Sequence, residues 1–121
     1  MVAGLGLAGG AAAASPGEQT FLDTCAACHQ PTGVGRPPVF PALKGDKFVL
    51  GPKAPLIATV LNGRGGMPAW KSELDDAKAA GVISYIRTAW GNKAPPVTAK
   101  DVAAVRANGA TAPQPKGLQA H

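Results

Sequence analysis

Residues that build large cores and metal clusters are scarce in this sequence. The 121 residues include two cysteines and two histidines, and aromatic side chains make up 5% of the chain. A single small domain with so few large side chains buries a thin core and usually depends on a disulfide, a metal or a bound cofactor. No stretch approaches about 20 consecutive apolar residues, so no segment is long enough to span a membrane.

Acidic residues are also scarce: the sequence has seven Asp and Glu but twelve Lys and Arg, which gives a formal net charge of +5. Residues 31–71 hold six of the basic residues against Asp46 alone. A nucleic-acid interface would need a dense basic run or aromatic side chains interleaved with basic ones, and the sequence has neither. The basic side chains are therefore expected either to be ordinary solvated surface residues or to steer the protein toward an acidic surface on a protein partner.

The first 14 residues, MVAGLGLAGGAAAA, are apolar and small. This composition is typical of the core and end of a secretory signal, although the positively charged start of such a signal is missing. We interpret residues 1–14 as a signal-like segment or linker remnant and leave them out of the fold. A secretory signal would place the protein in the periplasm.

Capping residues and apolar periodicity predict four helices. Ser15 with Glu18 marks the start of the first helix, and Thr98 with Asp101 marks the start of the last. Residues 30–53 contain five prolines and four glycines and are predicted to form a loop. The predicted helices cover about residues 15–27, 55–61, 72–90 and 98–108, and residues 110–121 are predicted to be disordered.

The two cysteines lie in the stretch CAACH, where Cys25 and Cys28 are followed at once by His29. A thioredoxin-like dithiol would need a βαβ context, which the flanking helix and loop do not provide. A structural zinc ion would need four ligands, and the other histidine is the terminal His121. The spacing favours covalent haem attachment, in which two thiols add to the two vinyl groups and the next histidine ligates the iron.

The second axial ligand of such an iron is predicted to be Met67. This residue lies in a glycine-rich loop, GRGGMPAW, whereas Met1 and His121 lie at the chain ends. Thioether ligation favours ferrous iron and raises the reduction potential. With both axial positions filled, the expected function is outer-sphere electron transfer. Two alternatives stay open: a haem enzyme or gas-binding sensor with a labile or absent Met67, and a metal-free or zinc-binding interaction module.

These motifs resemble those of class I cytochromes c, the soluble mono-haem electron carriers. The match covers about residues 15–92, which we expect to form the cytochrome c domain, with residues 93–121 as an extension containing a short helix and a disordered tail. The resemblance implies an all-α cytochrome c fold, in which three main helices and loops wrap around one covalent haem c. It also implies that the first and last helices of the cytochrome c domain, over residues 15–27 and 72–90, cross near the haem. Gly17, Phe21 and Tyr85 are expected to lie at this crossing.

The family resemblance implies further site residues. The carbonyl of Pro41 is expected to accept a hydrogen bond from the His29 imidazole, and Leu43 belongs to the same Pro-x-Leu motif. Trp70, three residues after Met67, is expected to line the haem pocket. The haem edge and propionates are expected to lie near a basic cluster that consists of Arg36, Lys44, Lys53, Arg64 and Lys71.

The longer pattern, from CAACHQPTGVG through VLNGRGGMPAW to YIRTAWGN, resembles bacterial c domains attached to respiratory dehydrogenase or oxidase complexes. This resemblance implies a periplasmic electron carrier and not an enzyme. It would move electrons between a dehydrogenase and a respiratory acceptor. The expected partners are redox proteins with acidic docking surfaces, with association to a membrane complex.

Overall fold

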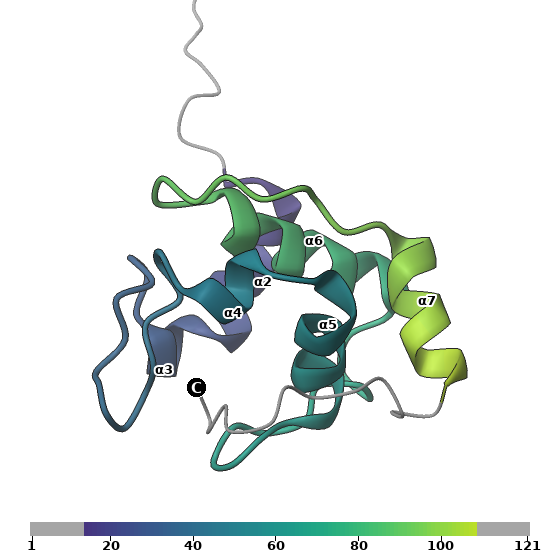
Figure 1. Cartoon of the computed structure of the whole chain (residues 1–121), viewed down its shortest axis with the longest axis horizontal. Coiled ribbons are helices and arrows are strands. Elements are labelled where there is room, and N and C mark those ends of the chain that lie inside the picture. The colour runs from purple at the N-terminus through teal and green to yellow at the C-terminus, as the bar shows by residue number, and fades with distance from the viewer. Residues whose placement is uncertain (1–13, 109–121) are drawn as a thin grey trace, which may run out of the picture.

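The computed structural model describes residues 14–108, and these residues form an all-α domain without a β-strand (Figure 1). The predicted signal-like segment up to residue 13, and the tail that includes His121, lie outside the described residues. The helices of the described part are α2 (Pro16–Thr24), α3 (Ala26–His29), α4 (Lys47–Leu50), α5 (Lys53–Asn62), α6 (Asp76–Thr88) and α7 (Ala99–Ala107).

Two predicted helix starts are confirmed by their caps. The Ser15 hydroxyl accepts a hydrogen bond from the backbone N–H of Glu18 at 3.1 Å, which satisfies one free donor of α2. At α7, the Thr98 hydroxyl accepts from the Asp101 N–H at 3.0 Å, and the Asp101 carboxylate accepts from the Thr98 N–H at 2.9 Å. This reciprocal capping box fixes the first turn of α7.

Three predicted boundaries are wrong. The first helix breaks at Cys25, so α2 and α3 are separate elements. The predicted loop over residues 30–53 contains α4, which begins where the Asp46 carboxylate accepts from the Val49 N–H at 3.0 Å. Helix α6 begins after Asp75, which caps it, and not at residue 72.

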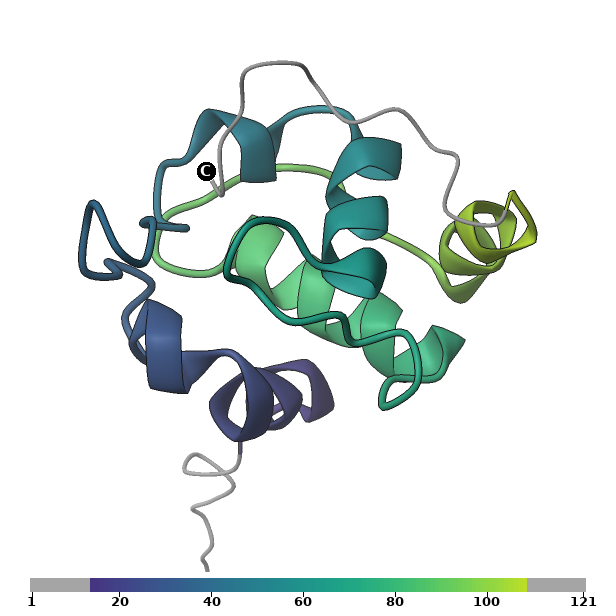
Figure 2. The same cartoon turned by 90° about the horizontal axis from the view of Figure 1, so that it is seen from below.

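Helices α2 and α6 cross at very short range, as the family resemblance implies (Figures 1 and 2). A Cβ atom on Gly17 would lie 2.4 Å from the carbonyl oxygen of Gly81, so glycine is the residue that permits this approach. Phe21 is fully buried beside the crossing, with its ring centroid 5.4 Å from that of Tyr85 and 5.3 Å from that of Trp90. Aromatic pairs at this separation add stability beyond their buried area.

Helix α7 packs against α5 and α6 (Figure 1). Val97, Val102 and Val105 belong to the same buried core as the helices before residue 92. Ion pairs at the periphery join Lys53 to Asp101 at 3.0 Å and Arg106 to Asp76 at 2.6 Å. The domain boundary at residue 92 stays a prediction, and the structure adds that the chain beyond it shares the core up to the end of α7.

No helix among the described residues has the length and apolar character needed to cross a membrane.

Candidate functional site

A largely apolar cavity of about 230 Å³ is lined by residues of α3 on one side and of α5 with its following loop on the other. Its walls also include α4 and part of α6. The structure brings together at this cavity the seven residues expected to hold the haem or line its pocket, although they come from three separate segments. These residues are Cys25, Cys28, His29, Pro41, Leu43, Met67 and Trp70.

His29 is the last residue of α3, and its ring is held by one hydrogen bond. The Nδ1 atom lies 2.8 Å from the carbonyl oxygen of Pro41. A carbonyl oxygen can only accept, so Nδ1 carries the proton and donates it. The neutral imidazole then has its lone pair on Nε2, which is the atom that can ligate a metal. The hydrogen bond expected from the Pro-x-Leu motif is therefore present.

The two cysteines form no disulfide with each other, and both are half-buried and line the same cavity. Burial raises the pKa of Cys25 above its ordinary value, the neighbouring Thr24 hydroxyl at 3.2 Å opposes this rise, and the nearby Cys28 adds to it. Among residues 14–108, no three His, Cys, Asp or Glu side chains come together as a metal cluster. The described part of the chain therefore offers no structural zinc site.

Met67 reaches the cavity from the loop between α5 and α6. The loop is closed by a pair of backbone hydrogen bonds, from Arg64 N–H to the Met67 carbonyl at 3.1 Å and from Met67 N–H to the Arg64 carbonyl at 2.9 Å. Gly63 has a φ of 78°, and a Cβ atom there would lie 2.5 Å from the Met67 carbonyl oxygen. The glycine-rich sequence thus shapes a tight turn that presents one thioether.

The predicted basic cluster divides in the structure. Arg64 lines the cavity, and its guanidinium lies 5.4 Å from the ring centroid of Phe48. Lys53 instead pairs with Asp101 on α7. The side chains of the other three, Arg36, Lys44 and Lys71, are exposed and are not part of the cavity lining.

Several wall residues were not predicted as site residues. They lie on α4, α5 and α6, and in sequence the apolar positions of these helices indicate only a core. They include Val49, Leu56, Thr59, Val60 and Ile86.

Asn92 is a further residue whose role was missed, because in sequence it reads as a helix stop. It is buried, and its amide donates to the carbonyls of Leu43 at 3.2 Å and Ile86 at 2.7 Å. Its oxygen accepts from the Gly45 N–H at 2.8 Å. Asn92 therefore fastens the loop that carries Pro41 and Leu43 to the end of α6.

The donor groups on this cavity are two thiols, an imidazole with Nε2 available and a thioether, within apolar walls. Imidazole and thioether are ligands that proteins offer to haem iron. Two cysteine thiols can attach the haem covalently by adding to its vinyl groups. An apolar cavity suits the flat, apolar face of a porphyrin. The residues present therefore fit a covalently attached haem, and fold and site together define a c-type cytochrome.

Comparison with known proteins identifies the family. The family model for cytochrome c oxidase, cbb3-type, subunit III, matches residues 12–86, and the chain belongs to this family. The cytochrome c subunit of alcohol dehydrogenase (quinone) from Gluconacetobacter polyoxogenes is 36% identical over 117 residues, covering 86% of this chain and 25% of that protein. The cbb3-type cytochrome c oxidase subunit CcoP from Azospirillum brasilense is 38% identical over 93 residues, covering 69% of this chain and 30% of that protein.

The cytochrome c subunit of gluconate 2-dehydrogenase from Pantoea cypripedii is 36% identical over 104 residues, covering 74% of this chain and 24% of that protein. The chain thus spans about a quarter of the length of the curated relatives it matches. The chain is a c-type cytochrome domain with covalent haem c, and its role is electron transfer. These relatives are cytochrome c subunits of dehydrogenases and a subunit of a cbb3-type cytochrome c oxidase.

Proposed function

We propose that this domain is a periplasmic one-electron carrier with His29 and Met67 as axial ligands and with Cys25 and Cys28 in thioether bonds to the haem. It takes electrons from a dehydrogenase and passes them to a respiratory acceptor. The observation that supports this proposal is the single cavity onto which both thiols, the imidazole and the thioether open. When bound, the haem supplies an iron that changes by one electron between its ferrous and ferric forms.

The side chains around the cavity have distinct roles in this proposal. The Pro41 carbonyl holds the His29 ring in one tautomer and makes Nε2 more electron-donating, because the Nδ1 proton is shared with an acceptor. The apolar walls exclude water and favour the less charged ferrous state. Arg64 is the basic residue of the predicted cluster that lines the cavity, so it is placed to neutralise a propionate.

Electron transfer needs one open edge, and Val39 marks it. Val39 lines the cavity and is 68% exposed, which is unusual for a large apolar side chain. The chain segment that contains Val39, residues 31–71, carries an excess of basic over acidic residues. A redox partner with an acidic rim would be steered to this face, and the association rate would fall as salt is added.

Met67→Ala tests the axial ligation. In the wild-type protein we expect a weak charge-transfer band from sulfur–iron bonding in the oxidised state, and the variant should lose this band and show a lower reduction potential. Lys71→Ala, at an exposed position four residues away, is the matched control and should keep both properties. A sulfur–iron band that survives in Met67→Ala would show that another residue is the ligand.

Carbon monoxide separates electron transfer from the alternative of a gas sensor or haem enzyme. A six-coordinate ferrous iron has no vacant position, so the reduced wild-type protein should bind carbon monoxide slowly or not at all at neutral pH. Met67→Ala should bind it readily. Rapid stoichiometric binding by the wild-type protein would favour the sensor or enzyme and contradict the carrier.

A further inference from the structure

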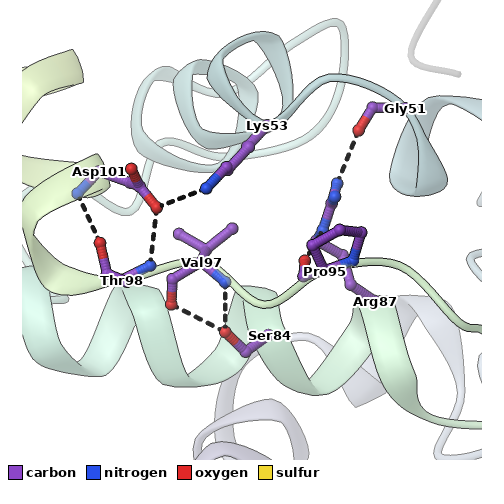
Figure 3. Close-up of polar contacts among 8 residues, drawn as sticks. All are labelled: Gly51, Lys53, Ser84, Arg87, Pro95, Val97, Thr98 and Asp101. Atoms are coloured by element: carbon purple, nitrogen blue, oxygen red, sulfur yellow. Dashed lines mark hydrogen bonds and ion pairs between the residues drawn. The ribbon is translucent and has the colours of Figure 1, made fainter.

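Arg87 is a buried cation near the end of α6, with a relative exposure of 2%. Its Nε atom donates to the Pro95 carbonyl at 2.7 Å, and its Nη1 atom donates to the Val49 carbonyl at 2.9 Å. The Nη1 atom also donates to the Gly51 carbonyl at 2.8 Å (Figure 3). These acceptors are backbone carbonyls and not carboxylates. They satisfy the N–H groups of Nε and Nη1 without cancelling the positive charge of the guanidinium.

The cation lies directly behind one wall of the cavity. Val49, whose carbonyl accepts from Arg87, lines the cavity, and so does Ile86, the residue before Arg87. Asp46 is the acidic residue nearest to this contact in the chain, but its carboxylate caps α4 at the opposite end from the carbonyls that hold Arg87. Charge interactions are strong over such short, apolar paths because the local dielectric is low.

The charge of Arg87 is permanent. Burial lowers the pKa of Arg87 from its ordinary value, yet a guanidinium stays protonated in proteins at any physiological pH. Three carbonyls from two other chain segments hold it in one place, so it does not reorient when the charge in the cavity changes. A fixed charge of this kind acts on a neighbouring redox centre without reorganisation.

We propose that Arg87 is an internal cation that raises the reduction potential of the haem by disfavouring the ferric state. This inference rests on the proposed function, because it requires a redox-active haem in the cavity. Oxidation removes one electron and adds one positive charge to the cavity. Repulsion between that charge and the Arg87 guanidinium penalises the oxidised state relative to the reduced state. Arg87 is thus a tuning residue that does not touch the iron.

A merely structural role makes a different prediction. Arg87 ties together α4, α6 and the chain around Pro95, so its replacement will lower stability whether or not its charge matters. Arg87→Lys keeps the positive charge but loses the planar fork that reaches separate carbonyls. Arg87→Gln keeps a hydrogen-bonding amide but loses the charge. Charge and structure are therefore separated by comparing these two variants.

The experiment is an equilibrium redox titration of the mature, haem-loaded full chain. At a fixed solution potential near the wild-type midpoint, the ratio of reduced to oxidised protein should fall severalfold in Arg87→Gln. It should stay within about twofold of wild type in Arg87→Lys. Lys100→Gln, which removes an exposed charge on α7, is the matched control and should also stay within that range. A wild-type ratio in Arg87→Gln, or an equal fall in both Arg87 variants, would overturn the proposal.

Two further measurements keep the test decisive. If Arg87→Gln does not accumulate as folded haem protein, Arg87→Met, which also lacks the charge, takes its place in the comparison with Arg87→Lys. A severalfold fall in the ratio of reduced to oxidised protein in Arg87→Met but not in Arg87→Lys supports the charge, and a wild-type ratio in Arg87→Met overturns it. The sulfur–iron band is recorded for each protein. If the wild-type protein lacks that band, the proposed His29/Met67 ligation fails, whereas a band that persists in all variants with unchanged potentials refutes only the role of Arg87.

Discussion

Replacing Gly17 with alanine tests how closely α2 and α6 must approach in the folded domain. A Cβ atom at position 17 would lie 2.4 Å from the Gly81 carbonyl oxygen, 2.9 Å from its carbonyl carbon and 3.3 Å from the Tyr85 Cβ atom. The two nearest atoms belong to the backbone of α6, so they cannot turn aside as a side-chain tip can. The helices must separate, and the contact between the Phe21 and Tyr85 rings must loosen with them.

The size of the effect follows from two opposing contributions. Overpacking of a close-packed core costs about 1–3 kcal/mol, and a backbone clash lies at the upper end. Alanine in place of glycine in a helix returns about 1 kcal/mol at most. The net loss in the free energy of unfolding should be about 2 kcal/mol, which lowers the Tm of a domain of this size by roughly 8–16 °C.

The matched control is Gly81→Ala, on the other side of the same crossing. Its Cβ atom would meet Gly17 Cα at 3.7 Å and Gly17 N at 3.9 Å, which are ordinary contacts. Because position 81 lies inside α6, this variant should gain up to about 1 kcal/mol from helix propensity. Guanidinium denaturation of both haem-loaded variants, followed by far-UV circular dichroism, should give midpoints that move in opposite directions. Midpoints that move together would refute the geometric reasoning.

Two further predictions concern the polar contacts that hold the helices and the loops. The pKa of Asp101 is lowered to about 2 by the hydrogen bond from the Thr98 backbone and then by Lys53. The ionised carboxylate therefore stabilises the fold fully above pH 3.8, and this contribution is lost as the pH falls through about 2. The stability difference between wild type and Asp101→Asn should accordingly shrink from pH 5 toward pH 2, and a difference that is constant with pH would contradict this cause. Asn92→Ala leaves the Leu43 and Ile86 carbonyls without their donor and should cost about 2–4 kcal/mol in guanidinium denaturation. A loss below about 0.5 kcal/mol would show that Asn92 does not fasten this loop.

Features that depend on neighbours in the chain could be predicted well. The spacing of Cys25, Cys28 and His29 defines the expected haem attachment, and the capping residues of α2 and α7 define two helix starts. These motifs are readable because all their atoms lie within one or two turns of backbone. The start of α6 was predicted at about residue 72, whereas the structure places the cap at Asp75. The turn in which the Leu74 N–H binds the Trp70 carbonyl at 3.0 Å leaves Asp75 as the cap.

Features that depend on distant partners could not be predicted. Helix α4 lies in a segment rich in proline and glycine, and the carbonyls near its end are held by Arg87, 36 and 38 residues away. Asn92 contacts Leu43, which is 49 residues away. In sequence, Arg87 reads as a favourable charge at the end of a helix and Asn92 as a helix stop. The local sequence does not show that the side chains of Arg87 and Asn92 are buried, and their roles depend on that burial.

The sequence alone was sufficient for the chemistry of the expected site, because thiol, imidazole and thioether groups are properties of residue types and their spacing is local. The folded chain was needed to show that these groups open onto one cavity. It also showed that Arg64 lines that cavity and that the buried guanidinium of Arg87 donates to the backbone of Val49, a residue of the cavity wall. These features depend on packing, since burial and proximity arise only when segments far apart in the chain exclude water together.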